Sequence, residues 1–119
     1  TSVKLPDDVH ASVMKAFDKC STNKEQIPDI LRRMTAGEVI DDPDFRKLLH
    51  CVYLETGFIK EDGRLLVEKA AALFPDKEAM LKILQECDKQ VVMSNPVDVV
   101  IQHFKCFQLT TPNRLALSP

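Results

Sequence analysis

The sequence predicts an all-α protein built as a compact bundle of six helices. Apolar residues recur at intervals of three and four positions along most of the chain, which places them on one face of a helix. Composition agrees, because 45% of residues are hydrophobic whereas glycine occurs 3 times, tryptophan is absent and Tyr53 is the only tyrosine. We expect residues 1–119 to form a single domain, large enough for one real core.

The first two helices are predicted from their ends and their apolar stripes. Pro6 and the two aspartates after it suit a helix N-terminus, and residues 21–23 (Ser-Thr-Asn) end this first helix. A shorter helix begins at Pro28 and ends at Gly37. The apolar residues at helical spacing are Val9, Val13, Phe17 and Cys20 in the first helix, and Ile30, Leu31 and Met34 in the second.

The next three helices follow the same logic. Asp42-Pro43 starts the third, which runs up to Gly57, and residues 60–63 then form a turn. The fourth is predicted from Leu65 to Phe74, where Pro75 stops it, and Asp76 caps the fifth. The buried stripes are Phe45, Leu48, Leu49, Cys51 and Val52 in the third helix, and Met80, Ile83, Leu84, Cys87 and Val91 in the fifth.

Residues 94–96 (Ser-Asn-Pro) break the chain before a sixth helix. This helix is predicted from Val97 to residue 107, and residues 110–112 end it. Residues 109–119 then form an apolar C-terminal tail, non-helical from Asn113 onward, that includes Leu115 and Leu117. The tail either covers or enters the interior of the bundle, or it is a frayed terminus.

Four cysteines lie inside these helical patterns. They are separated by 30, 35 and 18 residues, and no closely spaced Cys-x-x-Cys pair occurs. This even count without clustering favours disulfides over a metal site or a redox motif, and hence a protein that works outside the reducing cytosol. Four reduced, buried cysteines are the alternative. The four positions are Cys20, Cys51, Cys87 and Cys106.

One disulfide pairing is geometrically natural. In a helical hairpin that turns at Asn95-Pro96, Cys87 and Cys106 lie at comparable distances from the turn and face each other. This leaves Cys20 to pair with Cys51. The sequence itself leaves the other two of the three possible pairings open.

Charge and hydropathy exclude several classes of protein. The net charge is −2 with both signs mixed along the chain, whereas a nucleic-acid-binding protein carries a basic excess or stripe. No run of eighteen apolar residues occurs, so we expect no membrane span. The chain starts without an apolar signal segment, and we therefore expect it to be the processed form of an exported protein.

Taken with the turns, the cysteine spacing resembles that of the insect odorant-binding and pheromone-binding proteins, specifically their four-cysteine ("minus-C") type. The family pattern has six cysteines, with three residues between the second and third and eight between the fifth and sixth. The four cysteines here match its first, third, fourth and sixth. Further similarity lies in residues 45–53, 57–66 and 95–107, so that the resemblance covers nearly the whole chain.

The resemblance implies a fold and an activity. The family fold is a six-helix bundle around an internal apolar cavity, here braced by two disulfides that join first to third and fourth to sixth cysteine. It implies a secreted transport protein in sensillum lymph or haemolymph that carries odorants, pheromones, fatty acids or related lipids. A membrane receptor is a candidate recipient, and the oligomeric state is not specified.

Two positions depart from the six-cysteine pattern. Lys47 and Val97 stand where the family has its second and fifth cysteines, so the third and sixth helices lack a direct disulfide. We hypothesise that this seam opens more easily, with faster hydrogen exchange across residues 98–107 than in the third helix.

The resemblance makes many apolar stripe residues candidates for the cavity lining, although most such residues in any protein only pack the core. Methionine suits a broad-range binder because it adapts to irregular apolar shapes. Tyr53, Gln108 and Thr110 are candidates to orient a ligand oxygen, or else surface or capping groups. The predicted lining residues are Met14, Phe17, Met34, Leu48, Val52, Leu66, Leu73, Met80, Leu84, Val100, Phe104 and Leu117.

The sequence indicates no enzyme, cofactor or metal site. His50 precedes Cys51 directly, but adjacent residues of a helix point apart and so do not form a nucleophile and its base. His10, His50 and His103 lack ligand spacing, although their titration would allow release of ligand in acid. The alternatives to a carrier are a disulfide-braced interaction or haemolymph protein without a ligand and, less favoured, a secreted hydrolase.

Overall fold

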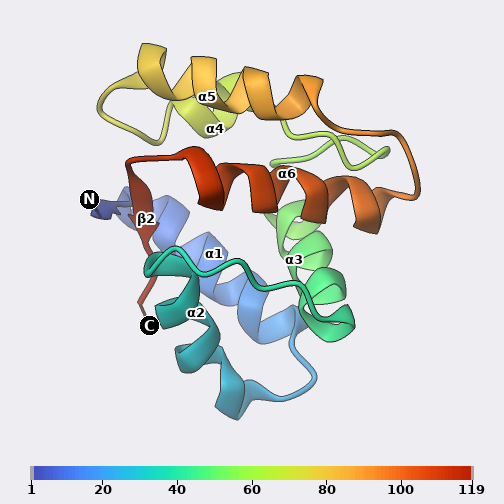
Figure 1. Cartoon of the computed structure of the whole chain (residues 1–119). Helices are drawn as coiled ribbons and strands as arrows, with labels where there is room; N and C mark the ends of the chain where they lie inside the picture. Colours follow the sequence, from blue (N-terminus) through green and yellow to red (C-terminus); the bar gives the residue numbers. More distant parts are fainter. Residues whose placement is uncertain (1, 119) are drawn as a thin grey trace.

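The computed structural model describes residues 2–118, which contain six α-helices, one short 3-10 helix and two three-residue strands (Figure 1). The elements are β1 (Ser2–Lys4), α1 (Asp7–Cys20), η1 (Lys24–Gln26), α2 (Ile27–Thr35), α3 (Pro43–Thr56), α4 (Val67–Ala71), α5 (Lys77–Lys89), α6 (Pro96–Thr110) and β2 (Arg114–Ala116).

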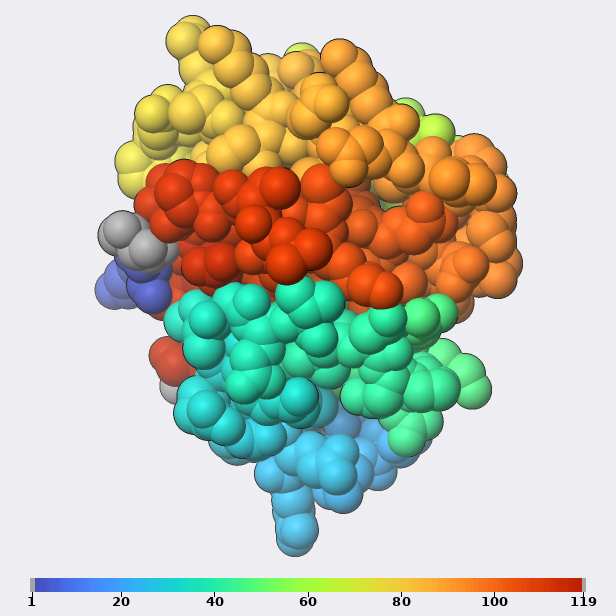
Figure 2. Space-filling view, in the orientation of Figure 1, coloured from blue at the N-terminus to red at the C-terminus, as the bar shows by residue number. Residues whose placement is uncertain are grey.

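Helix α6 lies at the centre of the arrangement (Figure 1). It runs antiparallel to α5, and the two helices form a hairpin. Helix α4 packs against α5. The opposite side of α6 packs against α3, which in turn packs against α1. Figure 2 shows α6 as a band between the α5 layer and the layer that contains α2. The six-helix prediction is therefore confirmed.

Local capping chemistry explains where three of the helices start. The side chain of Asp42 accepts a hydrogen bond from the backbone N–H of Phe45 at 2.9 Å, and Asp76 accepts one from Ala79 at 3.2 Å. Asn95 does the same for the N–H of Asp98 at 3.0 Å, immediately before Pro96 at the start of α6. Each cap satisfies a helical N–H that would otherwise lack a partner.

The fourth helix is shorter than predicted, because α4 covers only Val67–Ala71 instead of residues 65–74. Leu65 forms an isolated antiparallel bridge with Ile59, and the N–H of Leu66 donates to the carbonyl of Phe58 at 2.8 Å. These contacts hold both residues outside the helix. At the other end, Leu73 and Phe74 donate to carbonyls three residues back, so the chain tightens into turns.

The chain ends also differ from the prediction. Leu109 and Thr110 belong to α6, so the tail begins at Thr111, and Val91 lies beyond the end of α5. Strand β2 pairs in parallel with β1, with Val3 opposite Leu115, which ties the two ends of the described chain together. Strands of three residues are too short to produce a readable alternation in the sequence. Pro119 and Thr1 lie outside the described residues.

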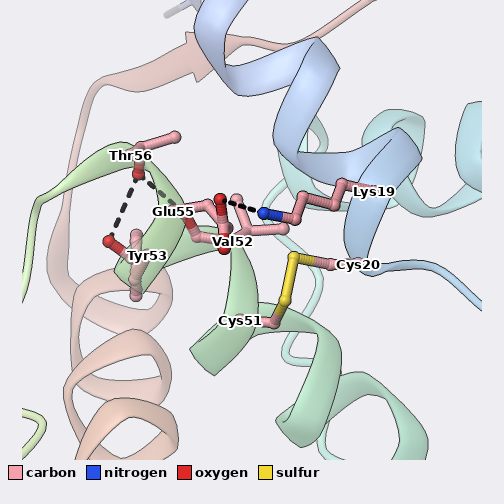
Figure 3. Close-up of a disulfide and its surroundings, with 7 residues drawn as sticks. All are labelled: Lys19, Cys20, Cys51, Val52, Tyr53, Glu55 and Thr56. Atoms are coloured by element: carbon pink, nitrogen blue, oxygen red, sulfur yellow. Dashed lines mark hydrogen bonds and ion pairs between the residues drawn. A yellow bond between two sulfur atoms is a disulfide. The ribbon is translucent and has the colours of Figure 1, made fainter.

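Two disulfides confirm the predicted pairing. Cys20–Cys51 joins the end of α1 to the middle of α3, and Cys87–Cys106 joins α5 to α6. Figure 3 shows the first of these beside an ion pair at 3.0 Å between Lys19 and Glu55, which links the same two helices. Both bridges therefore fix the helix pairs that frame the interior.

The seam between α3 and α6 is held without a disulfide. Arg46 on α3 and Asp98 on α6 form an ion pair at 3.1 Å, and Asp41 before α3 pairs with Lys105 of α6 at 2.5 Å. Beneath these charges, the rings of Phe45 and Phe104 pack with centroids 5.3 Å apart. As predicted, the four cysteines pair elsewhere, so ion pairs and an aromatic contact join α3 to α6 in place of a disulfide.

Candidate ligand-binding cavity

The interior of the bundle contains a cavity of about 130 Å³, and its wall is formed by α1, α2, α3, α4, α5, α6 and both chain ends. Most lining side chains are apolar, and they come from every layer of the fold. The lining residues are Leu5, Val13, Phe17, Met34, Leu49, Val52, Tyr53, Thr56, Phe58, Leu65, Ala70, Leu73, Phe74, Leu84, His103, Phe104, Phe107, Gln108, Arg114, Leu115 and Leu117.

Seven of the twelve predicted lining residues surround this cavity. They are Phe17, Met34, Val52, Leu73, Leu84, Phe104 and Leu117. The other five lie outside its wall, so their predicted contact with a ligand stays a prediction. They are Met14, Leu48, Leu66, Met80 and Val100.

Four of these five residues pack in the core clusters. Met80 and Val100 are each 1% exposed and lie in the larger core cluster, whereas Leu48 and Met14 belong to a smaller cluster between α1, α2 and α3. Leu66 precedes α4 at its N-cap position. Helical spacing identifies the inward face of a helix, but it does not distinguish an inward residue that packs against a neighbour from one that borders a space.

The lining also includes residues that sequence reasoning missed. Leu49 and Val13 lie on stripes that were recognised, so the periodic pattern contained a signal for them. Ala70 belongs to α4, for which no apolar stripe was predicted. His103 and Arg114 carried no signal, because a polar residue at such positions is normally exposed to solvent.

Four uncharged polar side chains interrupt the apolar wall. The Thr56 hydroxyl donates to the carbonyl of Val52 at 2.8 Å, and the Gln108 amide nitrogen donates to the carbonyls of Met34 and Glu38, each at 3.0 Å. Burial raises the pKa of Tyr53 to about 12, so that its phenol stays protonated. Tyr53 and Gln108 were predicted ligand-orienting groups and do line the cavity, whereas Thr110 is exposed and donates to Cys106.

The fourth polar group, His103, is neutral at pH 7. The residue is 6% exposed, and its Nε2 lies 3.2 Å from the carbonyl oxygen of Leu84. Burial lowers the pKa of its imidazole because the charged form loses its hydration. The uncharged ring therefore contributes surface to the cavity without contributing charge.

The C-terminal tail forms part of the cavity wall. Leu115 and Leu117 both line the cavity, and the hydroxyl of Thr35 on α2 accepts a hydrogen bond from the N–H of Leu117 at 3.0 Å. Pairing of β2 with β1 holds the same segment from the other side. Among the described residues, the tail is therefore ordered against the bundle and not frayed.

The size of the cavity limits what fits in it. Sites for drug-sized ligands span roughly 300–1,000 Å³, whereas a dry cavity of about 150 Å³ binds benzene. A space of about 130 Å³ thus matches a ligand with roughly six carbon atoms. Longer chains require a wall, such as the tail or the α3–α6 seam, to move.

The adjacent residues His50 and Cys51 do not act as a base and its nucleophile. Cys51 is bonded to Cys20 and so has no free thiol, and His50 beside it is half-buried, with burial lowering its pKa. Within residues 2–118, His, Cys, Asp and Glu form no group of three or more that could hold a metal ion. In the same part of the chain, every helix is too short or too polar to cross a bilayer.

The fold and the cavity define a class of protein, namely a disulfide-braced helical protein with an apolar interior site. Comparison with protein-family models then identifies the family. Residues 2–110 match the model of the PBP/GOBP family, and the chain belongs to this family of pheromone-binding and odorant-binding proteins. The family resemblance inferred from the cysteines is confirmed at this level.

Individual relatives are more distant. The chain is 26% identical over 99 residues to the B1 protein of Tenebrio molitor, an alignment that covers 80% of this chain and 75% of that protein. It is 24% identical to the B2 protein of Tenebrio molitor, with 80% of this chain and 76% of that protein covered.

Proposed function

We propose that this protein is a secreted carrier without enzymatic activity, which binds small hydrophobic molecules in its cavity and transports them through an extracellular fluid. The observation that carries the proposal is the apolar cavity of about 130 Å³. Its lining is mostly apolar, so a hydrophobic ligand placed there removes apolar surface of both partners from water, which favours binding.

Membership of the PBP/GOBP family supports this proposal, because its members are binding and carrier proteins. The two disulfides support an extracellular location, since such bonds persist in oxidising compartments. We further propose that a membrane receptor receives the carried molecule.

We also assign the protein to the four-cysteine type of the family. Lys47 is exposed and Val97 half-buried at the positions where the resemblance places the absent cysteines. The neighbouring residues Arg46 and Asp98 form the ion pair that crosses the seam there. A partly exposed ion pair contributes about 0–1 kcal/mol, whereas a disulfide contributes about 2–4 kcal/mol.

This difference bears on the range of ligands. The seam borders the cavity, because Leu49 and Val52 of α3 and Phe104 and Phe107 of α6 all line it. A weakly held seam separates at lower free-energy cost than a bridged one. We therefore expect the cavity to widen for odorants, pheromones or fatty acids that exceed its resting volume.

Energetics set the expected affinity. A ligand that buries about 250 Å² of apolar surface gains on the order of 6 kcal/mol, and association costs of several kcal/mol offset part of that gain. Because the net gain is about 4 kcal/mol or less, dissociation constants of roughly millimolar or weaker follow for six-carbon ligands.

Displacement of an environment-sensitive fluorescent probe tests the function. Alcohols, esters and fatty acids of increasing chain length are expected to compete in a saturable manner. If none competes, the disulfide-braced interaction or haemolymph protein without a ligand becomes the better account. Turnover of an ester in the same assay would instead support a secreted hydrolase.

A further inference from the structure

Arg114 places a positive charge in a mostly apolar cavity wall, and a purely apolar ligand would offer that charge no partner. The residue lines the cavity, and its Nε is buried without a hydrogen-bond partner. Its Nη2 donates to the backbone carbonyl of Gln108 at 2.8 Å, which is a neutral acceptor. Within residues 2–118, no carboxylate forms an ion pair with this guanidinium.

The guanidinium packs closely against a glycine. Gly37 has a φ of +85°, and a Cβ atom there would lie 2.5 Å from both Cζ and Nε of Arg114. Glycine thus permits both the left-handed backbone and the close approach of the planar group. The adjacent carboxylate, Glu38, is engaged by Arg33 at 2.6 Å.

The other ionisable groups of the wall do not compensate this charge. Tyr53 and His103 are both neutral at pH 7, for the reasons given above. Arg114 is therefore the one cavity-lining side chain among the described residues that carries a full charge. A half-buried guanidinium without a counter-charge is costly, and an anion placed against it offsets that cost.

We infer that Arg114 binds the carboxylate of the ligand, so that the preferred ligands are small monocarboxylates with an apolar tail of about five or six carbons. The planar N–H groups of arginine match the two oxygens of a carboxylate. The rest of the wall is apolar and accepts the tail. This inference deepens the proposed carrier function and rests on it, because it names the ligand class of the same cavity.

Isothermal titration calorimetry at about pH 7.5, where a carboxylic acid is ionised, compares hexanoate with 1-hexanol. Hexanoate is expected to bind the unmodified protein about tenfold or more tightly than the alcohol, because a hydrogen bond to a charged group adds to the shared burial of the tail. Equal affinities would overturn the role of Arg114 while leaving the carrier function intact. Failure of both ligands to bind would instead contradict the carrier function itself.

Variants of Arg114 test whether this residue causes the preference for hexanoate over 1-hexanol. Arg114→Gln is expected to reduce the preference for hexanoate to less than about threefold, whereas Arg114→Lys, which keeps the charge but not the planar pair of donors, gives an intermediate preference. Arg32→Gln removes the same charge from an exposed site outside the cavity and is the matched control, expected to leave the preference unchanged. A preference that survives Arg114→Gln, or that Arg32→Gln abolishes, would overturn the inference.

Discussion

Replacing Ala70 with leucine should fill the cavity and prevent binding of a six-carbon ligand without unfolding the protein. Ala70 lies on α4, and its side chain lines the cavity. Six carbons of benzene fit a cavity of about 150 Å³, so one carbon takes roughly 25 Å³. The three carbons added by leucine take roughly 75 Å³ of the available space of about 130 Å³. The remainder is too small for 1-hexanol.

The same substitution should leave the folded protein at least as stable as before. Three newly buried carbons contribute up to about 2.4 kcal/mol at ~0.8 kcal/mol each, and misfit in the wall reduces that gain. We therefore expect the free energy of unfolding in urea to stay the same or rise by about 1–2 kcal/mol. Loss of binding together with retained stability separates cavity filling from general damage to the fold.

Calorimetric titration with 1-hexanol and urea unfolding together provide the assay. Ala11→Leu is the control, because Ala11 is exposed on α1 and a leucine there leaves the cavity unchanged. We expect Ala70→Leu to weaken binding by at least about tenfold and Ala11→Leu to have no effect. Unchanged affinity in a folded Ala70→Leu protein would refute the placement of the ligand in this cavity.

Three further predictions concern stability. Amide protons of residues 98–107 should exchange faster than those of α3, and Asp41→Asn, which removes the ion pairs of Asp41 with Lys105 and Arg46, should accelerate them further; equal protection of the two helices would argue against a weak seam. Burial lowers the pKa of His103, so the unfolded chain takes up a proton first as the pH falls below about 6.5. The part of the unfolding free energy that depends on neutral His103 should therefore be fully present above that pH and be lost as the pH falls toward the lower pKa of the folded state. Urea unfolding at pH 7 and pH 5 should show a smaller decline in His103→Gln than in the unmodified protein. An identical decline in the two proteins would assign the effect to another group. Replacing both Cys87 and Cys106 with alanine should cost about 3 kcal/mol for a loop of 19 residues, and a cost near zero in urea unfolding would contradict the loop-entropy estimate.

The helix boundaries that the sequence predicted correctly depend on local chemistry. Asp42-Pro43 and Asp76 determine helix starts through bonds to residues only three positions away. The limits of α4 were wrong because Leu65 and Leu66 bond to Ile59 and Phe58, and only the folded chain brings these segments together.

The cavity was predictable only in part for a related reason. Leu84 and Met80 occupy the same inward stripe of α5, yet only Leu84 borders the empty space. Helices from elsewhere in the chain decide which inward-facing residue packs against a neighbour and which borders the cavity. Arg114 reaches the cavity because β2 returns along β1, a pairing that three-residue segments do not encode visibly.

The most direct test of the account is a titration of isotope-labelled protein with 1-hexanol, followed by nuclear magnetic resonance of the side-chain methyl groups. The account predicts saturable shifts at the methyl groups of cavity-lining residues such as Val52, Leu84 and Leu117. Exposed residues such as Val92 and Leu109 should not respond. Shifts confined to these exposed residues, or no saturable shift at all, would contradict the claim that the cavity is a ligand-binding site.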